Sequence, residues 1–518
     1  MKKQLLTTLL AYAAISATFA QTRPSVPRLV VGITIDKLRS DYLQAFSPLY
    51  SDEGFKKLLN EGQVYTNVQY PFTGIDRASA AATVITGTVP YNHGIISEKW
   101  MDRTSLTPIF CVDDDKFVGV NTKECSSPKN LRVSTLGDEL KVATNGKAKV
   151  FSIAPYRETA VLSAGHAADW AIWIDSQTGK WAGTSYYGKE PSWMVNVHQN
   201  NNALKIPRLT WAPDYTLDYN YFLATEQKSF SHTFKGDAAY RQYKNSGLVN
   251  ENVTTAAMYC ISSEDIALDI TPDFIAINYY AGNYDGKSQS ETTTELQDTY
   301  IRLDKEIAKL LKAIDRAIGL DKTLIYVTST GYDDTPADDL TKYRIPSGNF
   351  KINRCVALLN MYLTAMYGQG QYVESYYGTQ IYLNHKFIEQ KQLKLKEVLE
   401  HCEDFLFQFS GIRDVFTSQR LVQGAWTPGI SNIRNGYNPT CSGDITIQVA
   451  PGWSLVNEDR GTNQLQRDSF FEFPLIFYGF DLEAKQIHTP VTVDCIAPTI
   501  AHHIRIRAPN ACSTAPLF

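Results

Sequence analysis

After its first twenty positions the sequence has no uninterrupted apolar run of eighteen residues, so no later segment predicts a membrane-spanning helix. Its eight cysteines never occur as CxxC, and this spacing argues against a structural zinc site. The chain has no internal repeat, no low-complexity linker and no block of like charge. Its formal net charge of −4 argues against nucleic acid as a partner.

The first twenty residues have the composition of a secretory signal peptide. Lys2 and Lys3 precede an apolar core from Leu5 to Ile15, and Ala20 ends a small-residue cleavage site. A start-anchored membrane helix is the alternative, but the apolar run is too short to span a bilayer comfortably. We therefore expect a signal peptide at 1–20 and an exported protein that is periplasmic, secreted or on the outer surface of the cell.

The chain length of 518 residues allows one large α/β domain or two to three smaller ones. A hydrophobic content of 43% is sufficient for a substantial core. An even number of cysteines in an oxidising compartment is compatible with disulfides, and Cys111 with Cys125 is the best local pair.

Buried strands alternate with helices along most of the chain. Arg28 to Asp36 (RLVVGITID) predicts a central strand with an acid at its carboxyl end. Val150–Ala154, Phe274–Asn278 and Thr323–Thr328 predict further buried strands, and Thr292–Ile318 a long amphipathic helix. This alternation predicts a doubly wound, mostly parallel sheet, in which sites gather at the carboxyl ends of the strands.

Two regions interrupt the alternation. Residues 168–250 are rich in Trp, Tyr, Asn and Lys and are expected to form a cap inserted over the sheet. Residues 371–442 carry two more helices and predict a second insertion. We expect a single domain at 25–518 that includes both insertions.

The stretch from Phe72 to Ile95 predicts a helix of small residues at about Ala78 to Thr86, which ends at Gly87. The first turn of a helix presents free N–H groups and the positive end of the helix dipole. Such a turn is suited to holding a phosphate or sulfate group.

Several segments in order resemble the alkaline phosphatase superfamily. They include VVGITIDKLRSDYL at 30–43, TGTVPYNHGI at 86–95, AVLSAGHAADWAIWID at 160–175 and VDCIAPTIAHHIRI at 493–506. The nearest resemblance is to secreted bacterial phosphate-irrepressible alkaline phosphatases and to nucleotide pyrophosphatase/phosphodiesterases. It covers nearly the whole mature chain and implies an α/β/α sandwich with a mostly parallel central sheet and an inserted cap.

The resemblance implies two zinc ions roughly 4 Å apart, which activate a Thr or Ser nucleophile and stabilise the leaving oxygen. Of the six implied metal ligands, the first is present as Asp36. The other five positions carry residues that do not form a zinc site: Asn283, Lys287, Thr330, Gly331 and Gln464.

The positions that contact phosphate in the resembled family also differ. The nucleophile position carries Arg77, and the position of a phosphate-contacting Asn carries Glu98. The two positions of a Lys-x-Arg pair carry Tyr156 and Glu158. Asp36 is then either a relic ligand or an acid that pairs with Arg77 or Lys287, because burying it unpaired would cost several kcal/mol.

These substitutions predict an exported pseudophosphatase that is not an enzyme and holds no metal or cofactor. On this interpretation it is a non-catalytic binding, assembly or scaffold protein of the cell envelope, with an envelope or outer-membrane protein as partner. The 30 Tyr and 8 Trp are compatible with a binding surface, although core packing explains any single one equally well.

Two alternatives stay open. One is a divergent hydrolase of phosphate, phosphodiester or sulfate esters that uses Ser79 or Thr73 and a rebuilt zinc site. Replacement ligands would come from the acidic run GYDDTPADD at 331–339, which is more often a solvated turn. The other is an anion-binding protein in which Arg77 and Lys287 hold the ligand without turnover.

Overall fold

The computed structural model describes residues 26–214, 229–263, 266–288, 291–333, 344, 346–424, 427–465 and 471–518. The expected signal peptide lies outside these described residues, and so do Asp334, Asp338 and Asp339 of the acidic run. Within the described part of the chain no helix is both long and apolar enough to cross a membrane.

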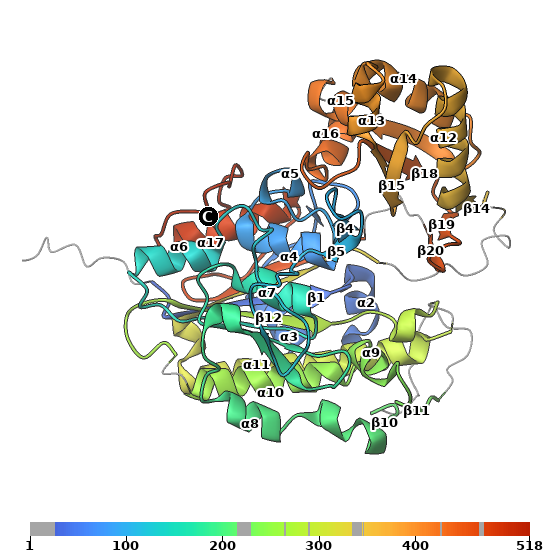
Figure 1. Ribbon diagram of the computed structural model, residues 1–518. Coiled ribbons are helices and arrows are strands. Elements are labelled where there is room, and N and C mark those ends of the chain that lie inside the picture. Colours follow the sequence, from blue (N-terminus) through green and yellow to red (C-terminus); the bar gives the residue numbers. More distant parts are fainter. Residues whose placement is uncertain are drawn as a thin grey trace, which may run out of the picture.

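A ten-stranded sheet forms the centre of the main body (Figure 1). Its strands in spatial order are β22 (Lys485–Ile487), β2 (Gln63–Tyr65), β21 (Leu475–Gly479), β13 (Thr323–Ser329), β1 (Leu29–Asp36), β12 (Asp273–Tyr280), β7 (Val150–Ile153), β8 (Trp170–Ile174), β9 (Trp181–Thr184) and β6 (Gly119–Val120). The five adjacent strands from β13 to β8 run parallel to one another, and antiparallel pairs occur only towards the two edges. The predicted fold class is confirmed.

Helices cover both faces of this sheet because every residue of β1 is buried and alternate residues point to opposite faces. One face packs against α2 (Ser40–Ala45), α3 (Phe55–Glu61), α8 (Met194–Gln199), α10 (Val249–Ser263) and α11 (Thr293–Ala317). The other packs against α4 (Arg77–Thr86), α6 (Leu136–Ala143), α7 (Arg157–Ala164) and α17 (Ile496–His503). Figure 1 shows these two helical layers above and below the sheet.

The small residues of α4 allow it to lie close against α7. Gly87 ends α4 in a left-handed conformation with φ 64°, which glycine adopts at little cost. Because α4 and α7 both begin at the carboxyl edge of the sheet, their first turns meet the ends of β1 and β12 there. The helix expected at Ala78–Thr86 is confirmed.

Short elements complete the main body. They are α5 (Pro90–His93), α9 (Ala239–Lys244), and the pairs β3 (Val68–Gln69) with β23 (Val491–Thr492), β4 (Lys99–Met101) with β5 (Pro108–Phe110), and β10 (Thr210–Trp211) with β11 (His232–Thr233).

A smaller unit with its own hydrophobic core lies at the upper right of Figure 1. It contains the sheets β14 (Gly348–Lys351), β19 (Trp453–Asn457), β20 (Thr462–Leu465) and β15 (Val373–Tyr377), β16 (Gln380–Leu383), β18 (Ile445–Val449), β17 (Ile412–Thr417). Its helices are α12 (Ile352–Tyr367), α13 (His385–Gln390), α14 (Leu395–Leu406), α15 (Ser418–Gln423) and α16 (Pro428–Asn435). This unit extends on both sides of the insertion expected at 371–442, because β14 and β19 pair from outside it. The domain boundaries themselves stay predictions.

The expected disulfide between Cys111 and Cys125 is not formed, since both residues are free thiols in the structure. Cys111 is fully buried, and burial raises the pKa of its thiol well above the usual value.

Gly32 provides a test of the strand packing beneath the site. A Cβ atom at this position of β1 would lie 2.3 Å from the hydroxyl oxygen of Tyr326 on the neighbouring β13. We expect Gly32→Ala to lower the free energy of unfolding by roughly 1–3 kcal/mol, because overpacking forces neighbouring side chains to move. Chemical denaturation followed by circular dichroism measures the change.

The matched control is Gly429→Ala in α16, where an added Cβ would meet nothing within 4 Å. We expect this change to be neutral or slightly stabilising. Equal losses of stability in the two variants would contradict the assigned packing.

Candidate active site at the carboxyl edge of the sheet

Arg77 is the centre of a buried charge network. It is the first residue of α4, and its Nε donates to Oδ2 of Asp36 at 2.9 Å. Its Nη1 donates to Oε1 of Glu158 at 3.1 Å. The Asp36 and Glu158 side chains are only 5% and 7% exposed, so both carboxylates depend on this guanidinium. The structure pairs Asp36 with Arg77 and not with Lys287.

The local sequence positions Arg77 and Glu158 at the starts of α4 and α7. Asp76 caps α4, since its carboxylate accepts from the Ser79 amide while the Ser79 hydroxyl accepts from the Asp76 amide. This capping box sets the direction in which Arg77 leaves the helix. Glu158 lies in the first turn of α7, where the helix dipole favours a negative charge.

The second oxygen of Asp36 is also occupied. The hydroxyl of Thr330, which follows β13, donates to Oδ1 of Asp36 at 2.9 Å. The Thr330 hydroxyl oxygen in turn accepts from the backbone N–H of Lys37 at 2.9 Å. Asp36 is thus fully engaged by protein groups.

Tyr156 forms the floor beneath Arg77. The Arg77 guanidinium carbon lies 3.5 Å from the centre of the Tyr156 ring, and Nζ of Lys244 lies 4.6 Å from it. Both are cation–π contacts in a desolvated setting, where such contacts are strongest. Burial lowers the pKa of Lys244 to about 8, although the nearby Glu158 opposes that shift.

The charged groups of the network shift one another's pKa values. Burial opposes the charge on Arg77, but Asp36 keeps the pKa of the guanidinium well above its usual value. Burial would raise the pKa of Glu158, yet Arg77 more than compensates and lowers it. For Glu98, burial and the nearby Glu158 charge raise the pKa to about 7. The site therefore combines an ionised carboxylate with one that holds a proton near neutrality.

The donor set does not fit two zinc ions. Of the implied ligand positions, only Asp36 carries a typical zinc ligand, and its oxygens bind Arg77 and Thr330. No group of three His, Cys, Asp or Glu side chains suited to a metal occurs among the described residues. We therefore assign no step to zinc.

Three predicted pocket residues lie apart from this network. Asn283 is buried and donates to the carbonyl oxygen of Lys287 at 3.4 Å across the turn η4 (Tyr284–Gly286). Lys287 is exposed. Gln464 lies on β20 of the smaller unit and is also exposed.

Ser79 and Thr73, the two candidate nucleophiles of the hydrolase alternative, both make local contacts in the structure. Ser79 is fully buried, and its hydroxyl donates to Asp76 at 2.8 Å. Thr73 is turned towards the smaller unit, where its backbone N–H donates to Asn432 of α16 at 3.2 Å. The hydroxyl of Ser79 is thus engaged in capping α4.

Sequence reasoning missed four residues around this network: Lys37, Lys244, Tyr280 and Tyr332. Lys37 directly follows Asp36, so its position at a strand end was a usable signal. Tyr280 ends β12 and offered the same signal. Lys244 lies in the expected cap insertion, where no motif marked it.

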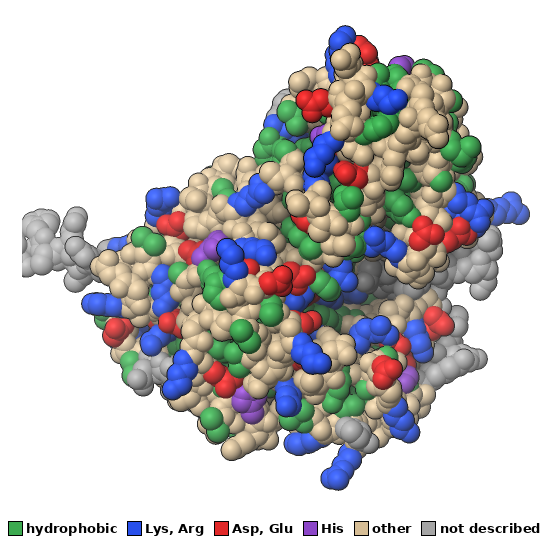
Figure 2. All heavy atoms as spheres, viewed as in Figure 1, with side chains coloured by type: hydrophobic (Ala, Val, Ile, Leu, Met, Phe, Trp, Pro, Cys, Tyr) green, Lys and Arg blue, Asp and Glu red, His purple; other side chains and the backbone are tan. Residues whose placement is uncertain are grey.

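Figure 2 shows a hollow between the main body and the smaller unit, with Lys and Arg side chains near its rims. Tyr377 on β15 of the smaller unit is close enough to Glu98 for that carboxylate, after burial, to raise the pKa of the phenol. The smaller unit thus lies over the Glu98 side of the site.

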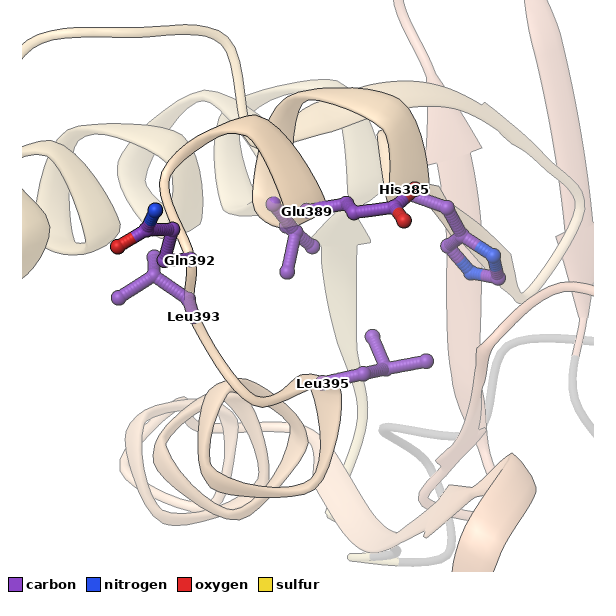
Figure 3. Close-up of a pocket in the computed structure, with 6 residues that line it drawn as sticks. His385, Glu389, Gln392, Leu393 and Leu395 are labelled. Carbon is purple, nitrogen blue, oxygen red and sulfur yellow. The ribbon is translucent and has the colours of Figure 1, made fainter.

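A separate cavity of about 410 Å³ lies between α13 and α14 (Figure 3). His385 lies at its edge, and its Nε2 hydrogen-bonds with Asp444 at 2.8 Å. This cavity contains none of the residues predicted for the pocket.

The chain is similar to known proteins over most of its length. Residues 30–471 match the family described as type I phosphodiesterase/nucleotide pyrophosphatase. A Myroides odoratus protein named calcium-transporting ATPase is 28% identical, with 97% of this chain and 96% of that protein covered. Alkaline phosphatase PafA of Elizabethkingia meningoseptica is 27% identical, with 100% and 98% covered.

A solved structure, wild-type alkaline phosphatase PafA, superposes with a TM-score of 0.84 at 25% identity. It covers 96% of this chain and 99% of its own. The similarity therefore holds for the three-dimensional arrangement of almost the whole chain as well as for its sequence.

The expectation of a non-catalytic binding or scaffold protein is wrong. The proteins that match this chain over almost their whole length carry the names of enzymes, and the matching family is one of hydrolases. The missing ligands identify a metal site that is lost, but they do not identify the reaction. The expected envelope partner stays a prediction.

The ion-pair network predicts a large stability effect. Replacing Arg77 by Met removes the only hydrogen-bonded cation of Asp36 and Glu158 among the described residues. We expect the free energy of unfolding to fall by roughly 3–5 kcal/mol at pH 8, because two buried carboxylates lose their partner. Chemical denaturation measures the loss, and Arg460→Met in the smaller unit serves as the matched control.

Lowering the pH should reduce this loss of unfolding free energy. Below about pH 5 the unpaired carboxylates can protonate, so the difference between Arg77→Met and the unsubstituted protein should shrink. A loss that does not change with pH would contradict the charge argument.

Substitution of Ser79 distinguishes a role in capping α4 from a role as the nucleophile. We expect Ser79→Ala to cost about 1 kcal/mol through loss of the capping box. Any phosphoric ester turnover should stay within about twofold of the unsubstituted protein. Loss of turnover with unchanged stability would instead make Ser79 a nucleophile.

Proposed function

Because the chain belongs to the type I phosphodiesterase/nucleotide pyrophosphatase family, we propose that it hydrolyses phosphoric or sulfuric esters at a rebuilt, metal-independent site. Family membership and the names of its full-length relatives support ester hydrolysis. The observation that carries the proposal is that the charge of Arg77 acts on Glu98, whose pKa burial and the nearby Glu158 raise to about 7.

Arg77 supplies the contact for the anionic ester. Its Nε and Nη1 are bound to carboxylates, whereas Nη2 has no hydrogen-bond partner among the described residues. The Arg77 side chain is 13% exposed, so solvent reaches part of this group. The two carboxylates fix the guanidinium plane, and a fixed donor loses little entropy when it binds an oxyanion.

Glu98 supplies the proton. In the proposed reaction a water oxygen bonds to phosphorus or sulfur while the ester bond to the leaving oxygen breaks. The leaving oxygen takes the bond's electron pair and the proton of Glu98. The proton that water loses restores the carboxyl group of Glu98. A general acid is most effective when its pKa lies near the working pH.

A second candidate is anion binding without turnover. It is favoured by the engagement of both nearby hydroxyls, since Ser79 caps α4 and Thr330 is bound to Asp36. It requires only Arg77 and its fixed geometry.

We also infer export from the cytoplasm. The composition of residues 1–20 supports a secretory signal, although these residues lie outside the described part of the chain.

Turnover of 4-nitrophenyl phosphate, bis(4-nitrophenyl) phosphate and 4-nitrophenyl sulfate in excess EDTA tests the proposal. We expect turnover of at least one ester that EDTA does not abolish, and a loss of about 100-fold in Glu98→Gln. Because Glu98 must be protonated to donate, the rate should be highest below about pH 7. Above that value it should fall about tenfold for each pH unit.

Glu53→Gln is the matched control, because Glu53 is an exposed carboxylate that pairs with Lys57 away from the site. Its turnover should equal that of the unsubstituted protein. Turnover that disappears with EDTA, or that Glu98→Gln leaves unchanged, would overturn the proposal. Binding without any turnover would establish the second candidate.

A further inference from the structure

We propose that Arg103, Asp444 and His385 form a clamp whose hold depends on protonation. The clamp joins the hairpin of β4 and β5 to the smaller unit, and it thereby fixes Glu98, which directly precedes β4. Its role in catalysis rests on the function proposed above, because that function assigns the proton donor to Glu98. The clamp itself is a property of the fold and can be tested without turnover.

The hairpin is fixed to the main body at its base. The backbone N–H of Glu98 donates to Oδ2 of Asp76, the residue that caps α4. The carbonyl oxygen of Glu98 accepts from the backbone N–H of Cys111 at 2.9 Å, which closes the hairpin after β5. Beyond this base each strand has only three residues. A two-stranded hairpin is marginally stable alone, so this one depends on further contacts.

The smaller unit supplies such contacts at the tip of the hairpin. Arg103 lies in the turn between β4 and β5, and its Nη1 donates to Oδ2 of Asp444 at 3.2 Å. Its Nη2 donates to the carbonyl oxygen of Ser442 at 3.0 Å. The guanidinium carbon lies 5.0 Å from the ring centre of Tyr382 on β16, and β15 lies against β4 (Figure 1). Arg103 therefore joins the tip of the hairpin to the smaller unit.

Asp444 is a buried carboxylate with two cationic partners. Its side chain is 4% exposed, so its charge depends on protein groups. Oδ2 accepts from Arg103 and, at 2.8 Å, from the backbone N–H of Leu383, while Oδ1 hydrogen-bonds with Nε2 of His385 at 2.8 Å. Burial would raise the pKa of Asp444, but His385 and Arg103 lower it below its usual value. A change in the charge of His385 therefore reaches Arg103 through one shared carboxylate.

His385 is the part of the clamp that can change its charge near neutral pH. It is the first residue of α13, and its side chain is half-exposed, so its proton can exchange with solvent. The hydrogen bond to Asp444 raises the pKa of His385, and the charges of Asp444 and of Glu374 on β15 act in the same direction. Burial and the charge of Arg103 oppose this shift. Glu389, on the same helix, lines the cavity beside His385.

The sign of the pH dependence follows from the raised pKa of His385. Its charged form contributes fully below the pKa of an unfolded histidine, about 6.5, and this contribution is lost as the pH rises through the folded value. The clamp is therefore tight in mild acid and looser in mild base.

Two asparagine contacts between the units do not depend on this charge. Nδ2 of Asn435 donates to the carbonyl oxygen of Pro71 at 2.7 Å, and Nδ2 of Asn438 donates to that of Tyr91 at 2.9 Å. These amide hydrogen bonds hold the smaller unit beside α5 at any charge of His385. Loss of the His385 proton should therefore loosen the hairpin without undocking the whole unit.

Hydrogen exchange of residues 99–111, followed by mass spectrometry, tests the clamp without any ester. The readout is the protection factor, the intrinsic exchange rate at a given pH divided by the observed rate, which reports local opening of the hairpin. His385→Gln keeps a hydrogen-bond donor for Asp444 but carries no charge. At about pH 5.5 we expect roughly threefold higher protection or more in the unsubstituted protein than in His385→Gln, in line with a partly exposed ion pair. At about pH 8.5 the two chains should agree to within roughly 1.5-fold.

Two features of the design isolate the charge of His385. Glu98, with a pKa of about 7, titrates in the same range, but both chains contain it, so comparing them at one pH removes its effect. His198→Gln is the matched control, because His198 pairs with Glu190 and belongs to α8 in the opposite helical layer. Its hairpin protection should equal that of the unsubstituted protein at both pH values.

Arg103 is the point at which the clamp reaches the hairpin. Arg103→Met should lower hairpin protection at both pH values, and Arg103→Lys should restore part of it, since a lysine can still pair with Asp444. Adding His385→Gln to Arg103→Met should change protection by less than about twofold, because Asp444 then no longer contacts the hairpin. Thermal unfolding of each variant checks that the fold is intact.

The clamp is overturned if the His385→Gln and unsubstituted chains protect the hairpin equally at about pH 5.5. It is also overturned if His385→Gln keeps its full effect in a folded Arg103→Met chain. The first comparison decides the proposal by itself where Arg103→Met does not fold.

Turnover tests the connection to Glu98. At about pH 5.5 His385→Gln should lower kcat roughly threefold and leave KM unchanged, because Glu98 acts in the transition state and not in substrate binding. The expected protection in a chain without turnover supports the clamp and rejects the proposed function. Turnover that needs Glu98 but is equal in His385→Gln rejects the role of the clamp in catalysis and keeps the hydrolase.

Discussion

One guanidinium group between two buried carboxylates organises the carboxyl edge of this sheet. Arg77 joins the first turn of α4 to the end of β1 through Asp36 and to α7 through Glu158. Asp36 extends the connection to the end of β13 through Thr330. Buried charges are costly unless they are paired and hydrogen-bonded, so none of these groups can be altered alone without exposing another.

The chemistry of the site follows from the same pairing. Two carboxylates neutralise one guanidinium, and a further carboxylate close by cannot also ionise easily. Glu98 is in that position, and burial together with the nearby Glu158 raises its pKa to about 7. A site of this kind offers proton transfer and a fixed cation, where a bimetal site offers Lewis acidity.

The sequence was sufficient to predict the fold and part of the site. Buried runs such as that ending at Asp36 and the small-residue stretch before Gly87 have strong local patterns, and motifs in the right order located Arg77 and Glu158 beside Asp36. The protonation of Glu98 was out of reach, because it depends on distances between groups far apart in sequence. Lys37 was missed because no residue pattern reports its left-handed backbone conformation, with a φ of 61°.

The functional prediction failed for a different reason. Absent ligands at Asn283, Lys287 and Gln464 describe the loss of one mechanism, and the structure gives these positions local roles or leaves them exposed. Inactivity does not follow, since a charge network can replace a metal at the same sheet edge. Residue-by-residue comparison could identify the missing metal ligands, while only the geometry could identify the charge network around Arg77.

The strand β2 has a consequence for how the chain matures. It pairs with β21 and β22, which lie about four hundred residues later in the sequence. Gln63, Val64 and Tyr65 therefore have no strand partners until the last tenth of the chain, roughly, has been made. This edge of the sheet therefore closes late, when most of the sequence between its paired strands has already been made.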